Sequence, residues 1–252
     1  MVTAQISERE KEIIKLLAND PGTSVARLSE LLSVSVVTVR SDLNDLEQKG
    51  ILLRTRGGAA PAFHPNVVER QSLNVEAKSR IAQAAAALVN DGDTIMIEAG
   101  TTTALVARHL LGKRFVNIVT NSTLILPFAR NNPGIHLTVV GGEFRPASES
   151  MVGPLALAQL ERFHVRLAIV GTDGFSLEGG LTTHLVEGAE IVRRMAERSG
   201  TVVLVADSSK YGKIGFVRVL PVQGVQRLVT DTGLSARAEE ELAGVGVEVL
   251  KA

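Results

Sequence analysis

The chain has 252 residues, 45% of them hydrophobic, which is enough to bury one large core or two smaller ones. Its 27 basic and 27 acidic residues cancel, so overall charge gives no argument for nucleic-acid binding. Cysteine is absent, which excludes disulfides and thiolate metal sites and favours a reducing cytoplasm.

The chain begins with a charged stretch where a signal peptide needs an apolar core, and no run of about 18 apolar residues occurs anywhere. We therefore expect a cytoplasmic protein with no membrane partner. The same stretch predicts a first helix, because Ser7 is a suitable N-cap, Glu10 follows three positions later, and an apolar stripe covers residues 13–17.

Two more helices are predicted, over residues 24–32 and 35–49, separated by a tight turn. The inward face of the second helix is expected to comprise Val25, Leu28, Leu31 and Leu32. The core face of the third is expected to comprise Val36, Val39, Leu43 and Leu46. Its outer face then carries Val37, Thr38, Ser41, Asp45 and Gln48, with Arg40 and Asn44 on one flank.

Residues 51–63 predict a hairpin of two short strands around Gly57 and Gly58, which permit the backbone of a tight turn. Lys49, Arg54 and Arg56 make this ribbon locally basic, with no acid between residues 49 and 58. Such a ribbon can lie along DNA phosphates. With the preceding helices it forms the pattern of a winged helix-turn-helix.

The third helix has the side chains that a major groove requires. Arg40 can reach a guanine edge or a phosphate, Thr38 and Ser41 can bond either, and Val37 offers an apolar contact to a thymine methyl. The candidate DNA-binding residues are Ser35, Val37, Thr38, Arg40, Ser41, Asn44, Arg54, Arg56, Gly57 and Gly58.

Two acids on the same helix weaken this interpretation. Asp42 and Asp45 disfavour DNA contact unless Arg40 or Lys49 neutralises them. Pattern alone leaves two alternatives open: a three-helix cap whose charges are merely solvated, and a head that binds protein instead of DNA.

A change of pattern near residue 65 predicts a domain boundary. We expect a DNA-binding domain over residues 1–60, a linker over 61–74 and an effector-sensing domain over 75–252. The last contains predicted strands at 94–97, 116–120, 136–140, 167–171, 202–206 and 227–230. Helices are expected to begin near residues 75, 102, 122, 186 and 235, which predicts an α/β domain with a mainly parallel sheet.

Polar and glycine-rich stretches follow several of these strands, where open α/β sheets bind ligands. A strand turns through Gly100 into a helix that begins with three threonines, and backbone N–H groups at a helix N-terminus favour a phosphate. The plain alternative is an ordinary N-cap and turn. The candidate effector-binding residues are Glu98, Gly100, Thr101, Thr102, Thr103, Asn121, Ser122, Gly141, Gly142, Arg145, Asp173, Gly174, Thr182, Thr183 and Lys210.

Motifs of other functions are missing from the sequence. It has no GxGxxG or GxxxxGK[ST] stretch, so no nicotinamide or ATP cofactor is expected. Its five histidines lack metal-ligand spacing. The alternative from another class is a sugar-phosphate isomerase or deaminase with an appended DNA-binding head, using Glu98, Asp173 and Lys210 as acid–base groups.

The motifs resemble those of the DeoR family of bacterial transcription regulators over nearly the whole chain. VSVVTVRSDL at 34–43 and RTRGGA at 54–59 resemble its N-terminal signature. Its sensor domain is resembled by KSRIA, DGD, GTTT, TNS, the GG pair with Arg145, MVGPLA, GTDG, GLTT and DSSK. The resemblance implies a regulator, and most simply a repressor of carbohydrate-metabolism genes, with a sensor fold similar to ribose-phosphate isomerases and CoA transferases. It implies double-stranded operator DNA and a phosphorylated sugar as partners, in a homodimer or homotetramer.

The chain departs from the family pattern at three places. Ser41 replaces the usual second arginine of the N-terminal signature, which bears on the operator sequence. Glu98 and Ala99 stand where the family has Asp-Ser, and Gly188 and Ala189 stand where a Glu-Ala pair usually opens a helix, with Glu187 one position earlier. The last two changes bear on the identity of the effector.

Overall fold

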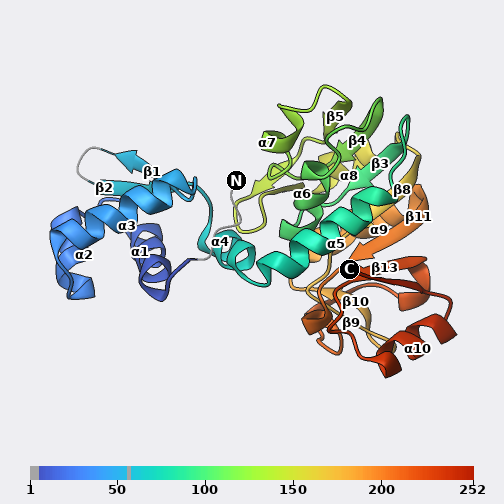
Figure 1. Ribbon diagram of the computed structural model, residues 1–252. Coiled ribbons are helices and arrows are strands. Elements are labelled where there is room, and N and C mark those ends of the chain that lie inside the picture. Colours follow the sequence, from blue (N-terminus) through green and yellow to red (C-terminus); the bar gives the residue numbers. More distant parts are fainter. Residues whose placement is uncertain (1–5, 56–57) are drawn as a thin grey trace. The chain divides into compact units, whose positions relative to one another are not determined.

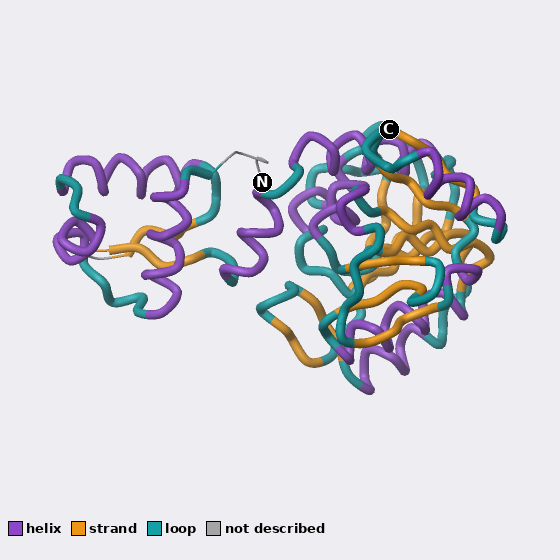
Figure 2. The backbone as a smooth tube through the Cα atoms, turned by 90° about the horizontal axis from the view of Figure 1, so that it is seen from below, coloured by secondary structure: helices purple, strands orange, loops and turns teal. Residues whose placement is uncertain are grey.

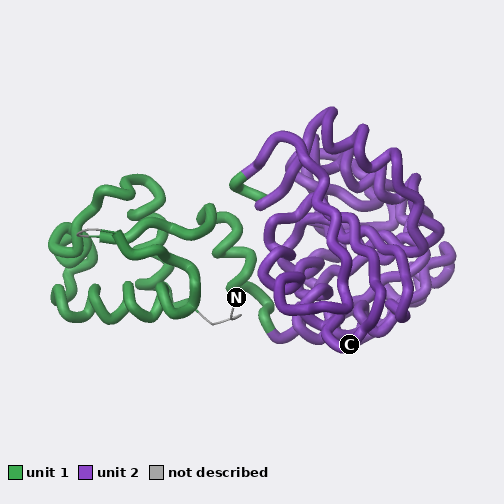
Figure 3. The backbone as a smooth tube through the Cα atoms, turned by 90° about the horizontal axis from the view of Figure 1, so that it is seen from above, with its two compact units in different colours: residues 1–75, 146–148 green, residues 76–145, 149–252 purple. Residues whose placement is uncertain are grey.

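The computed structural model describes residues 6–55 and 58–252, and the chain divides into two compact units (Figures 1 and 3). Residues 1–75 and 146–148 form the smaller unit, called the head below. Residues 76–145 and 149–252 form the larger one, called the sensor unit. Each has its own hydrophobic core.

The head is built on three helices, α1 (Glu8–Asn19), α2 (Val25–Leu32) and α3 (Val36–Gln48). A serine N-caps each helix, Ser7, Ser24 and Ser35 in turn, because its hydroxyl accepts a hydrogen bond from the backbone N–H of the third helical residue. The capping box predicted between Ser7 and Glu10 is present. The helices meet over a core that includes Ile13, Ile14, Leu17, Leu28, Val39, Leu43 and Leu46.

The predicted hairpin follows as β1 (Leu52–Thr55) and β2 (Gly58–Pro61), paired antiparallel with Thr55 opposite Gly58. The segment expected as linker contains a helix, α4 (Pro65–Ser72), which begins with proline in its first turn. Its Val68 is buried in the head core. The described part of the head is therefore three helices, a two-stranded wing and a packed fourth helix.

The sensor unit contains a seven-stranded sheet in the order β14-β13-β11-β8-β3-β4-β5, and every neighbouring pair is parallel. Its strands are β3 (Thr94–Ile97), β4 (Val116–Thr120), β5 (Ile135–Val139), β8 (Val165–Val170), β11 (Ser199–Val205), β13 (Arg227–Thr230) and β14 (Glu248–Lys251). The predicted mainly parallel α/β sheet is confirmed. Because every connection between parallel strands is a crossover, the loops that follow the strands gather at the carboxyl edge.

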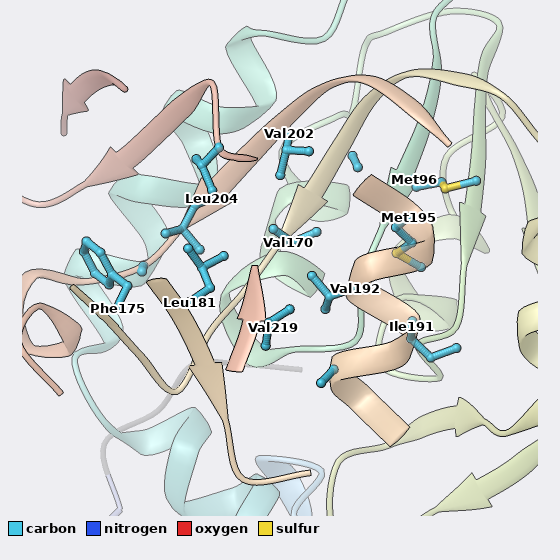
Figure 4. Packing of buried hydrophobic residues seen from close by; sticks show 14 of the residues in the cluster. Met96, Val170, Phe175, Leu181, Ile191, Val192, Met195, Val202, Leu204 and Val219 are labelled. Carbon is cyan, nitrogen blue, oxygen red and sulfur yellow. The ribbon is translucent and has the colours of Figure 1, made fainter. Parts of the chain in front are cut away.

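Helices cover both faces of this sheet (Figure 2). On one face, α5 (Val75–Ala87) and α6 (Thr101–Arg108) pack on alternate strand residues such as Ile95 and Ile97. On the other face, α8 (Pro154–Leu160), α9 (Val186–Glu197) and α10 (Ala236–Gly244) pack on the intervening residues such as Met96, Val170 and Leu204 (Figure 4). The alternation of one residue per face is what burial on both sides of a sheet requires.

Short elements surround the main sheet. A three-stranded antiparallel sheet is formed by β9 (Gly174–Ser176), β10 (Gly180–Thr183) and β12 (Val217–Leu220), and Phe175 and Leu181 anchor it in the core shown in Figure 4. A separate hairpin consists of β6 (Glu143–Arg145) and β7 (Ser150–Val152). The remaining elements are α7 (Leu126–Ala129), η1 (Ser208–Lys210) and η2 (Val222–Gly224).

Three local predictions are wrong. Leu31, expected to face inward, is 47% exposed, and Val36, expected in the core, is 37% exposed, because a core as small as the head's does not cover every apolar position of two helical turns. The third concerns the helix expected to begin near Ser122, which is absent from the described loop after β4. Ser122 instead bridges to Ser150, and α7 begins at Leu126.

Candidate functional sites

The outer face of α3 is free of the head core. Val37 is 74% exposed, and Arg40, Ser41 and Asn44 are exposed beside it on the next turn. Since residues three and four apart lie on one helical face, Val37, Ser41 and Asn44 form a continuous outer stripe. This places most of the predicted DNA-reading side chains on one accessible surface.

The hydroxyls at the start of α3 are engaged with one another. Ser35 Oγ accepts from the Thr38 backbone N–H at 3.0 Å and lies 2.8 Å from Thr38 Oγ1. Thr38 is only partly exposed. Its hydroxyl therefore has a fixed direction set by the cap.

Two buried acids of the described head, Asp42 and Glu10, each form an ion pair that joins α1 to α3 or its C-cap. Asp42 is buried and accepts two hydrogen bonds from Arg9, at 2.6 Å from Nε and 2.9 Å from Nη2. Glu10 accepts from Lys49 Nζ at 2.6 Å. Arg9 thus neutralises Asp42, which was the role expected of Arg40 or Lys49. The prediction that Lys49 extends the basic ribbon is wrong, because its ammonium pairs with the buried Glu10.

Burial raises the pKa of Glu10, but hydrogen bonds from Lys49 and Ser7 outweigh it, so the pKa lies below its ordinary value. A carboxylate held in its charged form by these partners ties α1 to the end of α3. Glu10 and Asp42 are therefore both paired inside the head. Of Asp42 and Asp45, the two acids that weakened the DNA interpretation, only Asp45 stays exposed on α3.

The wing presents Leu53, Arg54 and Thr55 to solvent, with Leu53 62% exposed. Arg54 is where the sequence predicted a phosphate-contacting side chain. Gly58 is buried instead, and a Cβ built on it would lie 3.0 Å from the Thr23 carbonyl oxygen, so its role is close packing of the wing. Arg56 and Gly57, also predicted to contact DNA, lie outside the described residues.

In the sensor unit, the loops after β3, β4 and β8 bring most of the predicted effector residues to the carboxyl edge of the sheet. Glu98 follows β3, and its Oε2 accepts from the Gly171 backbone N–H, just after β8, at 3.1 Å. A Cβ built on Gly100 would lie 3.7 Å from the same oxygen. Glu98, Gly100 and Gly171 therefore meet at the start of α6.

The first turn of α6 is arranged without a side-chain cap. Its N-cap is Gly100, which has no side chain to accept from the backbone N–H groups. Thr101 is partly exposed, whereas Thr102 and Thr103 are buried and Thr103 Oγ1 donates to the Gly100 carbonyl. Thr101 is therefore the most accessible of the three threonines.

The loop after β4 is held from both sides. Asn121 Oδ1 accepts from the Ala99 backbone N–H at 2.9 Å, and its Nδ2 donates to the Met151 carbonyl at 3.2 Å. The Asn121 side chain therefore links β3 to β7 and is used within the protein. Ser122 beside it is buried, and its Oγ has no hydrogen-bond partner among the described residues.

Asp173 organises the loops that follow β8 and β10. Its Oδ2 accepts from Thr183 Oγ1 at 2.8 Å and from the His184 backbone N–H at 3.0 Å. Thr182 and Gly174 are buried, and the Thr182 hydroxyl donates to the Gly174 carbonyl. Asp173 and Thr183 remain partly exposed, whereas Thr182 and Gly174 support them from inside.

Arg145 lies on β6 and is paired with two acids. Its Nη2 is 2.8 Å from Glu187 Oε1 and 3.1 Å from Glu143 Oε2. The hydrogen bond from Arg145 lowers the pKa of the Glu187 carboxyl. Glu187 was not among the predicted site residues, although its displacement by one position from the family pattern was the signal in the sequence.

The remaining predicted effector-binding residues are Gly141, Gly142 and Lys210. Gly141 and Gly142 are exposed before β6, and Gly142 has φ 150° with the Val152 carbonyl oxygen 2.5 Å from a built Cβ, so only glycine fits there. Lys210 is partly exposed on η1. No cluster of three metal-ligating side chains occurs among residues 6–55 and 58–252.

Comparison with known proteins agrees with both units. Residues 9–62 match the DeoR-like helix-turn-helix domain, and residues 73–232 match the DeoR C-terminal sensor domain. The chain belongs to the DeoR family of transcription regulators. It is therefore a DNA-binding regulator with a sensor domain for a small-molecule effector, and not an enzyme.

Two relatives of this DeoR-family regulator match it over nearly its whole length. The regulator GlpR of Haloferax volcanii is 34% identical over 248 residues, 97% of each chain. A protein of Escherichia coli O157:H7 named as an aga operon transcriptional repressor is 33% identical over 250 residues, 97% of this chain and 93% of its own. Ribose 5-phosphate isomerase from Plasmodium falciparum is similar over 55% of this chain and 54% of its own, with 20% identity and a TM-score of 0.40.

Within the described segments, no helix is both long and apolar enough to span a bilayer.

Proposed function

We propose that this DeoR-family regulator is a repressor of carbohydrate-metabolism genes whose affinity for operator DNA is changed by a phosphorylated sugar or a related metabolite. One observation carries the DNA-binding half of the proposal. The outer stripe of α3 is exposed while Asp42 is buried against Arg9, so Asp42 does not face DNA and the exposed acids of α3 are Asp45 and Glu47, near its C-terminal end.

On this surface, α3 enters the major groove and the wing lies along the backbone. Val37 contacts thymine methyl groups, Ser41 and Asn44 bond base edges, and Arg40 reaches a guanine or a phosphate. Ser35 and Thr38 stand at the end of α3 that meets the groove first. Arg54 contacts phosphate on the wing, and the sequence predicts the same contact for Arg56.

The effector binds at the carboxyl edge of the sensor sheet. The uncapped first turn of α6 and the guanidinium of Arg145 favour negative charge. The carboxylates of Glu98 and Asp173 accept hydrogen bonds and so suit the hydroxyl groups of a sugar. A phosphorylated polyhydroxy compound satisfies both kinds of group.

We propose a homodimer or homotetramer as the DNA-binding form. Two-fold symmetric operators present half-sites about 34–36 Å apart, which a pair of heads reads together.

The DNA-binding proposal is tested by selecting duplexes from a random pool and measuring affinity between about 50 and 200 mM salt. Arg54→Ala should weaken binding to all sequences and reduce the salt slope by about 0.9, because one phosphate contact is lost. Arg237→Ala, on the exposed surface of α10, is the matched control. Absence of salt-dependent duplex binding by the wild-type chain would refute the proposal.

The effector proposal is tested by thermal shift against phosphorylated sugars and polyols, each paired with its unphosphorylated counterpart. A ligand at 100 times its Kd stabilises the protein by about 2.7 kcal/mol. The expected result is stabilisation by a phosphorylated member only, accompanied by a changed affinity for the selected duplex. Equal stabilisation by both members of a pair would contradict the phosphate assignment.

A further inference from the structure

Arg145 is held by carboxylates of its own chain at a place where an anionic ligand is expected. Its Nη2 approaches Glu187 at 2.8 Å and Glu143 at 3.1 Å. Glu143 is on the same short strand, β6, whereas Glu187 comes from the first turn of α9, 42 residues further along the chain. The Arg145–Glu187 pair therefore connects two separate elements of the sensor unit.

Both elements are tied to the groups proposed to bind the effector. The hairpin containing β6 continues into β7, where Met151 donates to the Asn121 carbonyl at 2.7 Å, and Asn121 in turn holds Ala99 beside Gly100. On the other side, Glu187 follows by four residues Thr183, whose hydroxyl donates to Asp173. The ion pair thus joins the α6 side of the site to its Asp173 side.

The balance of charge at this edge is unfavourable to a phosphate as long as Glu187 stays on Arg145. Glu98 and Asp173 are already acidic, and Glu143 and Glu187 add two more carboxylates around one guanidinium. The pair is nevertheless easy to exchange, because the side chains of Arg145 and Glu187 are 38% and 34% exposed and solvent-accessible ion pairs are weak. A phosphate offers the guanidinium a bidentate, more highly charged partner.

We propose that Glu187 is an internal competitor for the effector: its carboxylate occupies Arg145 in the unliganded regulator, and the anionic group of the effector takes its place. Binding then costs the release of Glu187 and frees the first turn of α9 from β6. The exchange sets a threshold of effector concentration and favours dianionic ligands over singly charged ones. This inference rests on the proposed function in one respect, that the effector carries an anion.

The test is calorimetric titration of the full chain with inorganic phosphate at fixed ionic strength. Glu187→Gln removes the competing charge and should bind phosphate about threefold to tenfold more tightly than wild type. Glu190→Gln, an exposed acid on the same helix, changes net charge equally and should leave the affinity within about twofold. Arg145→Gln should bind weakly, and adding Glu187→Gln to it should restore nothing.

Circular dichroism and thermal unfolding establish that each variant is folded. If Glu187→Gln does not fold, Glu187→Asp keeps the charge on a side chain one methylene shorter, and a smaller gain in phosphate affinity is expected. The inference is overturned if Glu187→Gln binds phosphate no more tightly than Glu190→Gln, or if neither wild type nor Glu187→Gln binds it.

The failure of the proposed function gives a different pattern. If Glu187→Gln gains phosphate affinity while no phosphorylated sugar alters DNA binding, the competitor stands and the proposed effector class is wrong. If a phosphorylated sugar alters DNA binding but Glu187→Gln shows no gain, the effector class stands and the competitor is wrong.

Discussion

The head and the sensor unit use the first turns of their helices differently. In the head, the N-cap residue of α1, α2 and α3 is a serine whose hydroxyl accepts a hydrogen bond from a backbone N–H. In the sensor unit, the N-cap residues of α6 and α9 are Gly100 and Leu185, and neither provides a side-chain cap. The contrast is local, because α10, after β13 near the margin of the sheet, is capped by Ser235.

This difference separates structural from functional polar groups. The head caps the N-termini of α1, α2 and α3 and pairs both buried acids internally, which leaves the outer face of α3 accessible. The sensor unit leaves the first turn of α6 without a side-chain cap after β3, an interior strand of the sheet, where a ligand can accept from its N–H groups. Four predictions test the contrast.

The largest expected effect comes from truncating each core. Leu43→Ala in the head and Leu204→Ala in the sensor unit each remove a fully buried side chain, and each should cost about 2–5 kcal/mol of unfolding free energy. Because the two cores are separate, scanning calorimetry should show Leu43→Ala lowering one transition and Leu204→Ala another. A single transition shifted by both variants would show that the units unfold together.

Six of the seven strands of the sheet were predicted from sequence, and the edge strand β14 was not. Strands covered on both faces have almost continuous apolar runs, as Ile95, Met96 and Ile97 do, and these runs stand out from the surrounding loops. Strands β6, β7 and β9 have three residues each, too few to establish a period. They are fixed by contacts with distant loops, such as Ser122 with Ser150.

The inner face of α3 shows a second limit. Periodicity assigned Val36 to the core, whereas Asp42 is buried and Val36 is exposed. A buried aspartate requires a partner, and the partner is Arg9, 33 residues away on another helix. Helical spacing does not reveal such a pair, and the same reason hid the attachment of Lys49 to Glu10.

The second prediction concerns the first turn of α6 in the sensor unit, which has no side-chain cap. Thr101→Asp places a carboxylate in the first turn of α6. A negative charge at this end stabilises the helix, but it repels a phosphate. Affinity for a phosphorylated effector should fall at least about tenfold, or about 1.4 kcal/mol. The control is Thr101→Asn, which has nearly the same shape without the charge. Equal losses in both variants would indicate a steric effect.

The third prediction concerns the internal ion pairs of the head. The pKa of Glu10 in the folded head is below its ordinary 4.5, so its stabilising contribution is complete above that pH and is lost as the pH falls through the folded value. The free energy of unfolding of the head should therefore decline more steeply on acidification from about pH 6 to about pH 3 in wild type than in Glu10→Gln. Denaturant titrations at each pH measure this, with Glu12→Gln as the exposed control on α1. Parallel curves for wild type and Glu10→Gln would show that the pair with Lys49 contributes nothing.

The smallest expected effect comes from opening one capped helix in the head. Ser35→Ala removes the hydroxyl that accepts from the Thr38 N–H, and the free energy of unfolding of the head should fall by about 1 kcal/mol. It also releases the Thr38 hydroxyl from Ser35, at the end of α3 proposed to meet the groove first. Ser35→Gly restores most of a cap's stability, since glycine costs only a few tenths of a kcal/mol there, but it restores no hydroxyl. If DNA affinity falls equally in both variants while only Ser35→Ala loses stability, the Ser35 hydroxyl acts on DNA or through Thr38. If DNA affinity falls only in Ser35→Ala, together with stability, the cap affects DNA binding only by stabilising the helix. This outcome is expected if the serine caps of the head are purely structural.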